Sequence, residues 1–135
     1  MIWVKGEGRQ TVNKESLLLG EQKARYRYNI LLSGVGEEGQ KKLLASSALL
    51  VGAGGLGSPA AYYLAAAGVG QLGLVDPDVV ELSNLQRQIL HRTADVGRTK
   101  VESAREKLLA LNPGIEVEVF AARFSPENAA SLVGR

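Results

Sequence analysis

The sequence predicts an α/β, Rossmann-like domain with a mostly parallel sheet and helices on both faces. A glycine-rich turn, Gly52 to Gly57, separates a short apolar run from a helical pattern. A second apolar run ends at Asp76, and a helical pattern followed by an alternating strand covers residues 99–121. Strands that alternate with helices are typical of parallel sheets. We expect about three strands, so the fold is expected to be truncated.

The composition indicates one soluble domain. The 135 residues include 16 basic and 14 acidic side chains, and the net charge of +2 is too small to favour binding to nucleic acid. No apolar run approaches the roughly 20 residues of a membrane span, so we expect no membrane partner. The chain has no cysteine, which excludes disulfides, thiolate nucleophiles and cysteine-based zinc sites, and fits a cytoplasmic location.

The chain divides into an arm and a domain. Residues 1–20 show no sustained period and are predicted to be a weakly ordered arm, whereas residues 21–135 form the domain. The domain is predicted to open with two helices, over residues 21–32 and 37–46.

The next elements form a βαβ unit. Residues 48–51 and 71–76 are predicted to be parallel strands, joined by a helix that ends at Gly68. Ser58 is predicted to be its N-cap, with Pro59 at the first helical position.

The last elements are a helix, a strand and a short helix. The helix covers residues 99–111, with a capping box between Thr99 and Glu102, and a strand follows over residues 115–121. A final helix begins near Ser125. In the usual strand order, residues 115–121 pair outside residues 72–75, which leaves the strand at 48–51 with an open edge. Because open edges of buried strands favour association, we expect the chain to self-associate or to need a further segment.

The glycine turn predicts a phosphate site. Gly52, Gly54 and Gly57 fit the pattern G-x-G-x-x-G directly after a strand and before a helix. Missing side chains let backbone amides approach a phosphate, and the helix N-terminus adds partial positive charge. The alternative is a tight turn without a ligand.

Asp76 extends this prediction from a phosphate to a nucleotide. It ends the second strand, 24 residues after Gly52, where a carboxylate can accept hydrogen bonds from ribose hydroxyls. In the sequence Asp76-Pro77-Asp78 it could instead only form a turn.

A polar segment after the second strand suggests a triphosphate. Asn84, Arg87 and Lys100 are its main candidates, and Arg87 lies three residues after Asn84, on the same face of a helical turn. An Arg fork and a Lys charge can stabilise the oxygens of a phosphate under attack. Taken singly, each cation is also explained as a solvated surface charge. His91 has no visible partner and is interpreted as a surface or packing residue.

Four segments resemble one family. The runs VGAGGLGSPAA, SNLQRQ and VGRTKVESA, with the Asp76 and Asp78 pair, resemble the adenylation domain of the MoeB/ThiF/HesA family, which includes the ubiquitin-activating enzymes. The resemblance covers about residues 22–123 and corresponds to the N-terminal half of that ATP-binding domain.

The resemblance implies a function for these residues. Gly52, Gly54, Gly55 and Gly57 would line an ATP site, Asp76 would hold the ribose, and Asn84 and Arg87 would contact the phosphates. Lys100, with Arg87, would stabilise charge during transfer. The implied reaction is adenylation of the C-terminal glycine of a ubiquitin-like sulfur-carrier protein ending in Gly-Gly, of the molybdopterin or thiamine type. It implies Mg²⁺ with ATP, and a homodimer.

The sequence departs from the family in two respects. The family's RYxRQ element supplies an arginine to the partner's ATP, but here RYRYN places Tyr28 at that position and Asn29 at the glutamine. Tyrosine brings no charge, so Arg25 or Arg27 would have to replace it. The family's magnesium-binding aspartate, catalytic cysteine and zinc cysteines belong to a downstream half, and no metal ligand is assigned within this chain.

Two other functions fit parts of the sequence. An NAD-dependent Rossmann oxidoreductase explains the glycine turn and Asp76 but not the SNLQRQ run or Lys100. A non-catalytic nucleotide-binding or dimerisation module explains the missing arginine. Tighter binding of ATP than of NAD would distinguish the adenylating enzyme from the oxidoreductase. Nucleotide binding without pyrophosphate exchange would identify the non-catalytic module.

Overall fold

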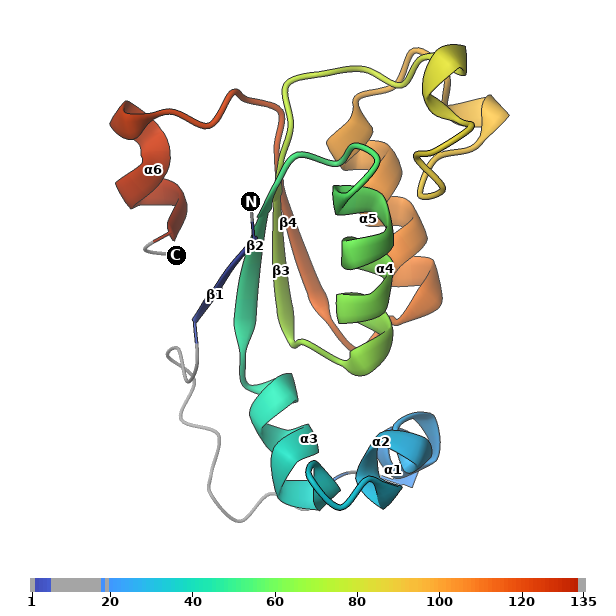
Figure 1. The fold of residues 1–135 in the computed structure, drawn as a ribbon, viewed down its shortest axis with the longest axis vertical. Helices are drawn as coiled ribbons and strands as arrows, with labels where there is room; N and C mark the ends of the chain where they lie inside the picture. The colour runs from blue at the N-terminus through green and yellow to red at the C-terminus, as the bar shows by residue number, and fades with distance from the viewer. Residues whose placement is uncertain (1, 6–17, 19, 134–135) are drawn as a thin grey trace.

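The sheet forms the centre of the molecule in a computed structural model that describes residues 2–5, 18 and 20–133. Its strand order is β1-β2-β3-β4 (Figure 1). The strands are β1 (Ile2–Lys5), β2 (Ser47–Val51), β3 (Gln71–Val75) and β4 (Glu116–Phe120). As predicted, β2, β3 and β4 are parallel, and β4 pairs with β3 on the side away from β2.

The edge of β2 is not open, so that prediction was wrong. β1 pairs antiparallel with β2, with Ile2 opposite Leu50 and Lys5 opposite Ser47. The arm predicted to be weakly ordered therefore contributes a strand, and its other residues lie outside the described part of the chain, apart from Leu18 and Gly20. A strand of four residues is too short to show a period in a sequence. Self-association stays a prediction, without the open β2 edge as its basis.

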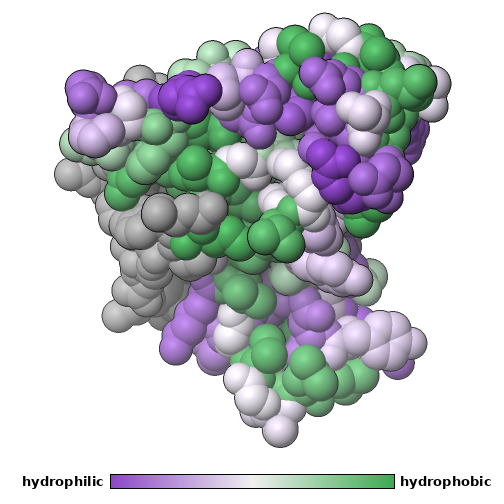
Figure 2. Space-filling model, turned by 45° about the horizontal axis from the view of Figure 1, so that its top comes forward, coloured by the Kyte–Doolittle hydropathy of each residue, from purple (hydrophilic) through white to green (hydrophobic). Residues whose placement is uncertain are grey.

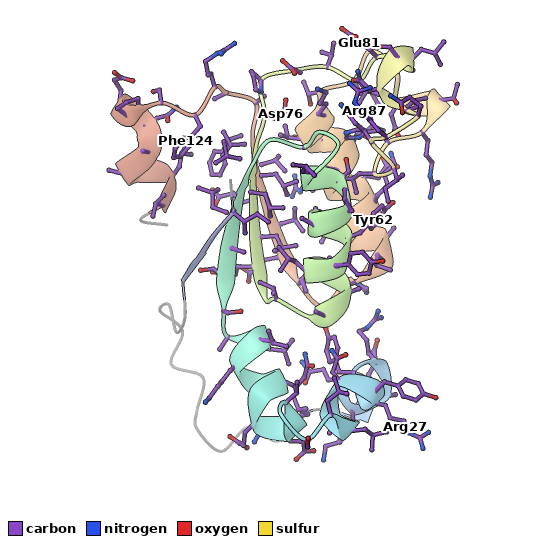
Figure 3. All side chains as sticks on the ribbon, viewed as in Figure 1. Arg27, Tyr62, Asp76, Glu81, Arg87 and Phe124 are labelled. Carbon is purple, nitrogen blue, oxygen red and sulfur yellow. The ribbon has the colours of Figure 1, made fainter. Side chains whose placement is uncertain are left out.

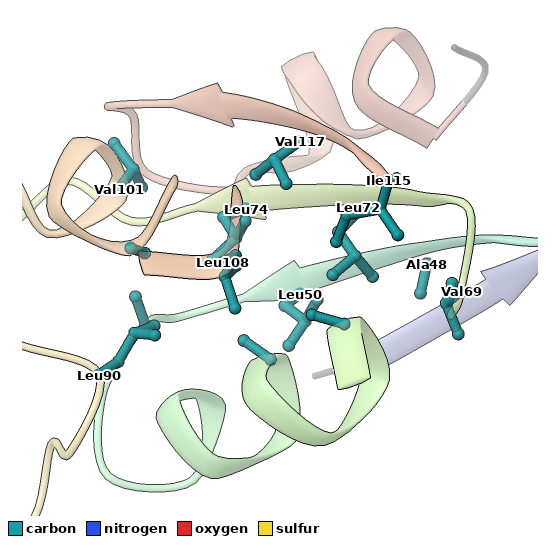
Figure 4. Close-up of a cluster of buried hydrophobic side chains, with 14 residues drawn as sticks. Ala48, Leu50, Val69, Leu72, Leu74, Leu90, Val101, Leu108, Ile115 and Val117 are labelled. Atoms are coloured by element: carbon teal, nitrogen blue, oxygen red, sulfur yellow. The ribbon is translucent and has the colours of Figure 1, made fainter. Parts of the chain in front are cut away.

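Helices cover both faces of the sheet, as predicted. α4 (Gly57–Ala67) and α5 (Lys100–Leu111) lie side by side on one face, and α6 (Pro126–Val133) lies on the other side (Figure 1). Buried apolar side chains from β2, β3, β4, α4 and α5 fill the space between the first face and its helices (Figure 4). Ala61, Ala65 and Ala104 are fully buried there, and their small side chains allow close packing on the sheet.

Three short helices lie at the end of the sheet where β2 and β3 begin (Figure 1). They are α1 (Gly20–Arg25), α2 (Arg27–Leu31) and α3 (Gly36–Leu44). The helix predicted over residues 21–32 is thus broken at Tyr26, whose backbone leaves the helical region (φ −100°, ψ 16°). The break lets the Tyr26 ring pack inward, where it is 2% exposed.

This end of the molecule is closely packed. Gly68 is left-handed (φ +84°), as predicted for the end of α4, and a Cβ there would lie 2.6 Å from the Tyr26 ring. A Cβ on Gly70 would lie 1.9 Å from the Leu44 carbonyl oxygen. Asn112 donates to the Tyr26 hydroxyl (2.8 Å) and to a carbonyl of α4, so polar groups buried here are paired.

None of the helices in the described part of the chain combines the length and apolar character needed to cross a membrane.

Candidate functional site

Two glycines of the turn between β2 and α4 are required by the backbone. Gly52 has a φ of +98°, a conformation that side chains rarely allow. A Cβ on Gly57 would lie 1.9 Å from the carbonyl oxygen of Gly52, which is a severe clash. The fold therefore explains both glycines without a ligand.

The two glycines between them are not required by the fold. A Cβ on Gly54 would meet only the Gln88 Nε2, at 3.8 Å. A Cβ on Gly55 would meet only the Arg87 side chain, at 3.6 Å from its Cγ and Cδ. These are ordinary van der Waals distances, so alanine would fit at both positions. Only the side chains of Gln88 and Arg87 come near these two positions, so a ligand that approaches the backbone here would also lie against them.

The peptide groups of Ala53 fix the shape of the turn. The Ala53 amide donates to Oδ2 of Asp76 at 2.7 Å, and the Ala53 carbonyl accepts from the Ser58 hydroxyl at 3.1 Å. The Nε2 of His91 also reaches this carbonyl, at 3.3 Å. The prediction for Ser58 was wrong, because the residue before α4 is Leu56 and no side chain caps the helix. The Ser58 hydroxyl bonds back into the turn instead.

Asp76 lies at the carboxyl end of β3, directly beside the turn. It is 5% exposed, and its Oδ1 accepts from the Asp78 amide at 2.9 Å. The turn-forming role considered from the sequence is therefore present. Each carboxylate oxygen has two lone pairs, so both can accept a further hydrogen bond. A role toward ribose remains compatible with these contacts.

The segment after β3 carries Asn84 and Arg87. Asn84 ends a short 3₁₀ helix, and its Oδ1 accepts from the Glu81 amide at 3.1 Å. Arg87 is exposed and donates to the Ser83 carbonyl at 3.1 Å, with its stem against Gly55. The structure thus brings Arg87 to the turn, whereas the buried Asn84 side chain holds its own helix together.

Lys100, at the start of α5, is bound to Asp78. Its Nζ lies 2.9 Å from Oδ2 of Asp78, and the Lys100 side chain is 8% exposed, against 63% for Asp78. A buried ammonium group requires such a partner. Because Asp78 lies two residues after Asp76, the contact places Lys100 at the same edge of the sheet as Asp76. The sequence alone does not predict this ion pair, because Asp78 and Lys100 lie 22 residues apart.

A single face of α5 holds the segment of residues 77–99 in place. Lys107 and Asp95 form an ion pair in which both side chains are nearly fully buried. Burial alone raises the pKa of Asp95, but hydrogen bonds from Lys107 and from the Arg92 amide outweigh burial and lower the pKa to about 2. One turn before Lys107 on the same face, Ser103 lies 2.9 Å from Nδ1 of His91.

His91 links the turn to α5 as a buried packing residue. Burial lowers the pKa of His91, more than the hydrogen bond to Ala53 raises it, so the ring is neutral at pH 7. Because a carbonyl can only accept, the proton is assigned to Nε2, and Nδ1 then accepts from the Ser103 hydroxyl. The packing interpretation of His91 is confirmed, but the partners that the sequence did not reveal are Ala53 and Ser103.

Two buried side-chain polar atoms in the described residues have no hydrogen-bond partner, and both lie in or beside this segment. They are the Gln88 Oε1 and the Thr99 Oγ1. Such a group costs about 1 to 3 kcal/mol when it is left unpaired. Thr99 makes no cap to α5, so the predicted capping box with Glu102 is wrong.

The cations of the N-terminal helices lie far from this site. Figure 3 shows Arg27 at one end of the molecule and Asp76 and Arg87 at the opposite end. Arg25 donates to the Leu111 carbonyl at the end of α5 (3.0 Å), and Tyr28 is 80% exposed. Neither arginine can reach the turn of its own chain, so any contribution would have to come from a second copy.

The surface around the site is mixed. Figure 2 shows hydrophilic and hydrophobic residues side by side on the end of the molecule that carries the segment after β3. Leu56, Leu82 and Ile89 are exposed, at 90%, 67% and 60%. The described residues contain no group of three His, Asp or Glu side chains that could hold a metal ion. A hollow of about 120 Å³ lies elsewhere, between the sheet and α6.

Comparison with known proteins identifies relatives. Residues 26–135 match the ThiF family. The chain is 50% identical over 121 residues to the probable adenylyltransferase/sulfurtransferase MoeZ of Mycobacterium tuberculosis, which covers 90% of this chain and 31% of MoeZ. It is 52% identical over 116 residues to the adenylyltransferase and sulfurtransferase MOCS3 of Anopheles gambiae, covering 86% of this chain and 26% of MOCS3.

A solved structure with a bound nucleotide has the same fold. The structure of Escherichia coli TcdA, a tRNA N6-threonylcarbamoyladenosine dehydratase, in complex with ATP matches with a TM-score of 0.80 and 30% identity. The match covers 88% of this chain and 48% of TcdA. The chain therefore spans less than a third of MoeZ and MOCS3, and about half of TcdA.

Proposed function

Because the chain belongs to the ThiF family of adenylyltransferases, we propose that it binds ATP at the glycine turn and contributes this site to the adenylation of a protein carboxylate. The substrate we propose is the C-terminal glycine of a ubiquitin-like sulfur-carrier protein that ends in Gly-Gly, of the molybdopterin or thiamine type. The relatives' names favour this function over the NAD-dependent oxidoreductase considered from the sequence.

One observation carries the proposal. Gly52 and Gly57 are explained by the backbone, but Gly54 and Gly55 are not required by the fold, since a Cβ at either position would make only ordinary contact with one side chain. Arg87 lies against Gly55, and the N-terminus of α4 lies next to the turn. Backbone amides, a guanidinium group and a helix N-terminus together suit an anionic ligand. Asp76, beside the same turn, is the group proposed for the ribose.

The proposed reaction is a single displacement at the α-phosphate. A carboxylate oxygen of the carrier's terminal glycine forms a bond to the α-phosphorus, and the bond from this phosphorus to the oxygen bridging to the β-phosphate breaks. Pyrophosphate leaves with that electron pair, and the carrier becomes an acyl-adenylate. Charge moves toward the leaving oxygens, so a fixed cation stabilises the transition state.

Arg87 and Lys100 are the residues proposed to supply this charge. Arg87 is exposed and can offer two parallel N–H groups to phosphate oxygens. Lys100 is held by Asp78, whose carboxylate is largely exposed. Asn84, whose Oδ1 is used within its own helix, can offer its amide nitrogen. Mg²⁺ enters as the complex with ATP, and the proposal assigns it no ligand from the described residues.

Assembly and location are part of the proposal. A homodimer is proposed because Arg27 is exposed but lies at the far end from its own chain's turn. A cytoplasmic location is proposed because the chain has no cysteine and its charge is balanced.

The test combines binding with exchange. ATP and NAD affinities are first measured on the chain, and the proposal requires tighter binding of ATP. Incorporation of labelled pyrophosphate into ATP is then measured with a carrier ending in Gly-Gly, on the chain alone and on the chain joined to the remaining part of MoeZ. We expect exchange that needs the carrier and is lost in Arg87→Ala, whereas Arg105→Ala, an exposed arginine of α5, leaves it unchanged. ATP binding without exchange in either protein would instead indicate a non-catalytic nucleotide-binding module.

A further inference from the structure

We propose that the edge of β2 is a docking site for a further parallel strand, and that β1 occupies this edge until such a strand displaces it. The strand that displaces β1 comes from the part of a ThiF-type protein that lies beyond the region matched by this chain. The inference concerns the assembly of the sheet, so it goes beyond the proposed function and does not depend on nucleotide binding.

The position of β1 is the first support. The three parallel strands follow one another along the chain as β2, β3 and β4, and they lie in space in the order β4-β3-β2. In a doubly wound sheet with the usual order 3-2-1-4, the fourth parallel strand pairs with the first on its free side. That side of β2 carries β1, which runs antiparallel to it (Figure 1). β1 therefore takes the place that this kind of sheet gives to another parallel strand.

The difference between β2 and β4 is the second support. Ala48, Leu49 and Leu50 of β2 are all buried, and because successive side chains of a strand point to opposite faces, both faces of β2 are covered. β4, the outer strand on the other side of the described sheet, has Glu116 and Glu118 exposed. Charged side chains discourage further pairing at a sheet edge, whereas an apolar strand buried on both faces is typical of a sheet interior. β2 therefore has the composition of a strand with two neighbours in a parallel sheet.

The relatives indicate where the incoming strand is found. The match to the ThiF family covers residues 26–135, so it includes β2 but not β1. The matched region is only 31% of MoeZ and 48% of TcdA, which leaves a large part of each relative to supply a strand.

β1 is a small partner for β2. It has four residues, and Ile2 is half-exposed. A strand that belongs to a folded half-domain brings further elements with it and buries more apolar surface than four residues can. Displacement of β1 is therefore favourable once that half-domain is present.

The two strands exclude each other. The free edge of a strand offers one row of N–H and C=O groups, and β1 takes this row from Ile2, opposite Leu50, to Lys5, opposite Ser47. Without the incoming strand, β1 covers an edge that would otherwise favour association with other chains. β1 thus protects β2 and lowers its apparent affinity for the incoming strand.

The test follows Trp3, the only tryptophan of the chain, which lies opposite Leu49 in the β1–β2 pair. The chain is labelled with fluorotryptophan, and the part of MoeZ beyond the match is added as a separate, unlabelled polypeptide. We expect the two to bind, and we expect the fluorine resonance of Trp3 to narrow and to move to its position in the urea-unfolded chain. Binding with an unchanged resonance would overturn the inference.

Variants of Val4 test the competition. Val4→Pro weakens the pairing of β1, because proline lacks a backbone donor, whereas Val4→Thr keeps the β-branched shape and is the control. We expect the Kd for the MoeZ part to fall about tenfold in Val4→Pro and to stay unchanged in Val4→Thr, since only the proline removes the competing strand. Val4→Pro alone should self-associate in sedimentation velocity. Equal Kd values for all three proteins would overturn the inference.

A joined protein keeps the test decisive if Val4→Pro or the separate MoeZ part fails to fold. The chain is joined to the same part of MoeZ and labelled, and Trp3→Phe identifies the resonance of Trp3. We expect this resonance at the position of the unfolded chain. A resonance at the position seen in the chain alone would show that β1 stays on β2, and the inference would fail. None of these measurements contains nucleotide, so a failure leaves the proposed function untouched.

Discussion

The two ends of the central sheet are built differently. At the amino end, Gly68 and Gly70 are pressed against Tyr26 and Leu44, and the buried side chain of Asn112 is paired. At the carboxyl end, a Cβ on Gly54 or Gly55 would make only ordinary van der Waals contact with a side chain, and the unpaired oxygens of Gln88 and Thr99 lie in the adjoining segment. Glycine thus allows close packing at one end of the sheet, and at the other end it leaves the backbone accessible to a ligand. The number of glycines in a segment therefore does not identify a ligand site. The atoms that a Cβ would contact at each glycine distinguish a packing role from a binding role.

The largest effect is expected from the ion pair that anchors the carboxyl-end segment to α5. Lys107→Met removes the buried ammonium partner of Asp95, whose remaining partners are Arg98, the Arg92 amide and the Ser103 hydroxyl. We expect a loss of about 3 kcal/mol in the free energy of unfolding, measured by urea denaturation. Lys42→Met, an exposed lysine of α3, is the control and should change it by less than about 0.5 kcal/mol. Equal losses in both would show that the buried pair does not anchor the segment.

The next effect sharpens the contrast between the two ends. Gly70→Ala places a Cβ against the Leu44 carbonyl, and we expect a loss of about 2 to 3 kcal/mol in unfolding free energy. Gly54→Ala places a Cβ in ordinary contact distance, and stability should change by less than about 1 kcal/mol. Chemical denaturation of the two variants measures both values. If Gly54→Ala were the more damaging substitution, the open end would be a packing feature.

A smaller effect is expected on ATP binding at the carboxyl end of the sheet. Gly55→Ala should weaken ATP binding about tenfold, which corresponds to about 1.4 kcal/mol, because the methyl group occupies the space beside Arg87. Isothermal titration calorimetry measures it. Ala66→Gly, an exposed position of α4, controls for backbone flexibility and should leave ATP affinity unchanged.

The smallest effect concerns pH. The pKa of His91 lies below its ordinary value of 6.5, so the unfolded chain takes up a proton that the folded chain resists. This contribution to stability is present above pH 6.5 and is lost as the pH falls below it. His91→Gln retains a donor to Ala53 and should lose less stability than the unaltered chain between pH 7 and pH 5. The pKa of Asp95, about 2, adds a further loss in both proteins only as the pH falls below about 4. Parallel curves between pH 7 and pH 5 would contradict the assignment to His91.

Much of the fold could be predicted from periodic patterns. The apolar runs predicted β2 and β3, and the alternating pattern predicted β4, with the strand order that the structure has. The alanine-rich segment predicted α4. β1 was missed because four residues carry no period, and the break at Tyr26 was missed because it depends on a distant contact with Gly68. Tertiary contacts of this kind leave no local signal in the sequence.

The site was predictable in its residue types but not in its contacts. The glycine pattern pointed to the turn, and SNLQRQ pointed to Arg87. The sequence could not separate Gly54 and Gly55 from Gly52 and Gly57, because that distinction depends on what a Cβ would meet. It also could not pair Lys100 with Asp78 or place His91 against Ala53, since these contacts join segments 22 and 38 residues apart.

The most direct test of the central claim is an amide chemical-shift titration of the isotope-labelled chain with ATP. Glycine amides report binding at the backbone itself, and both ends of the sheet contain glycines. We predict the largest shifts at Gly52, Gly54 and Gly55, with Gln88 affected as well, and no shift at Gly68 or Gly70. Shifts concentrated at Gly68 and Gly70, or an absence of shifts at the turn with saturating ATP, would contradict the account.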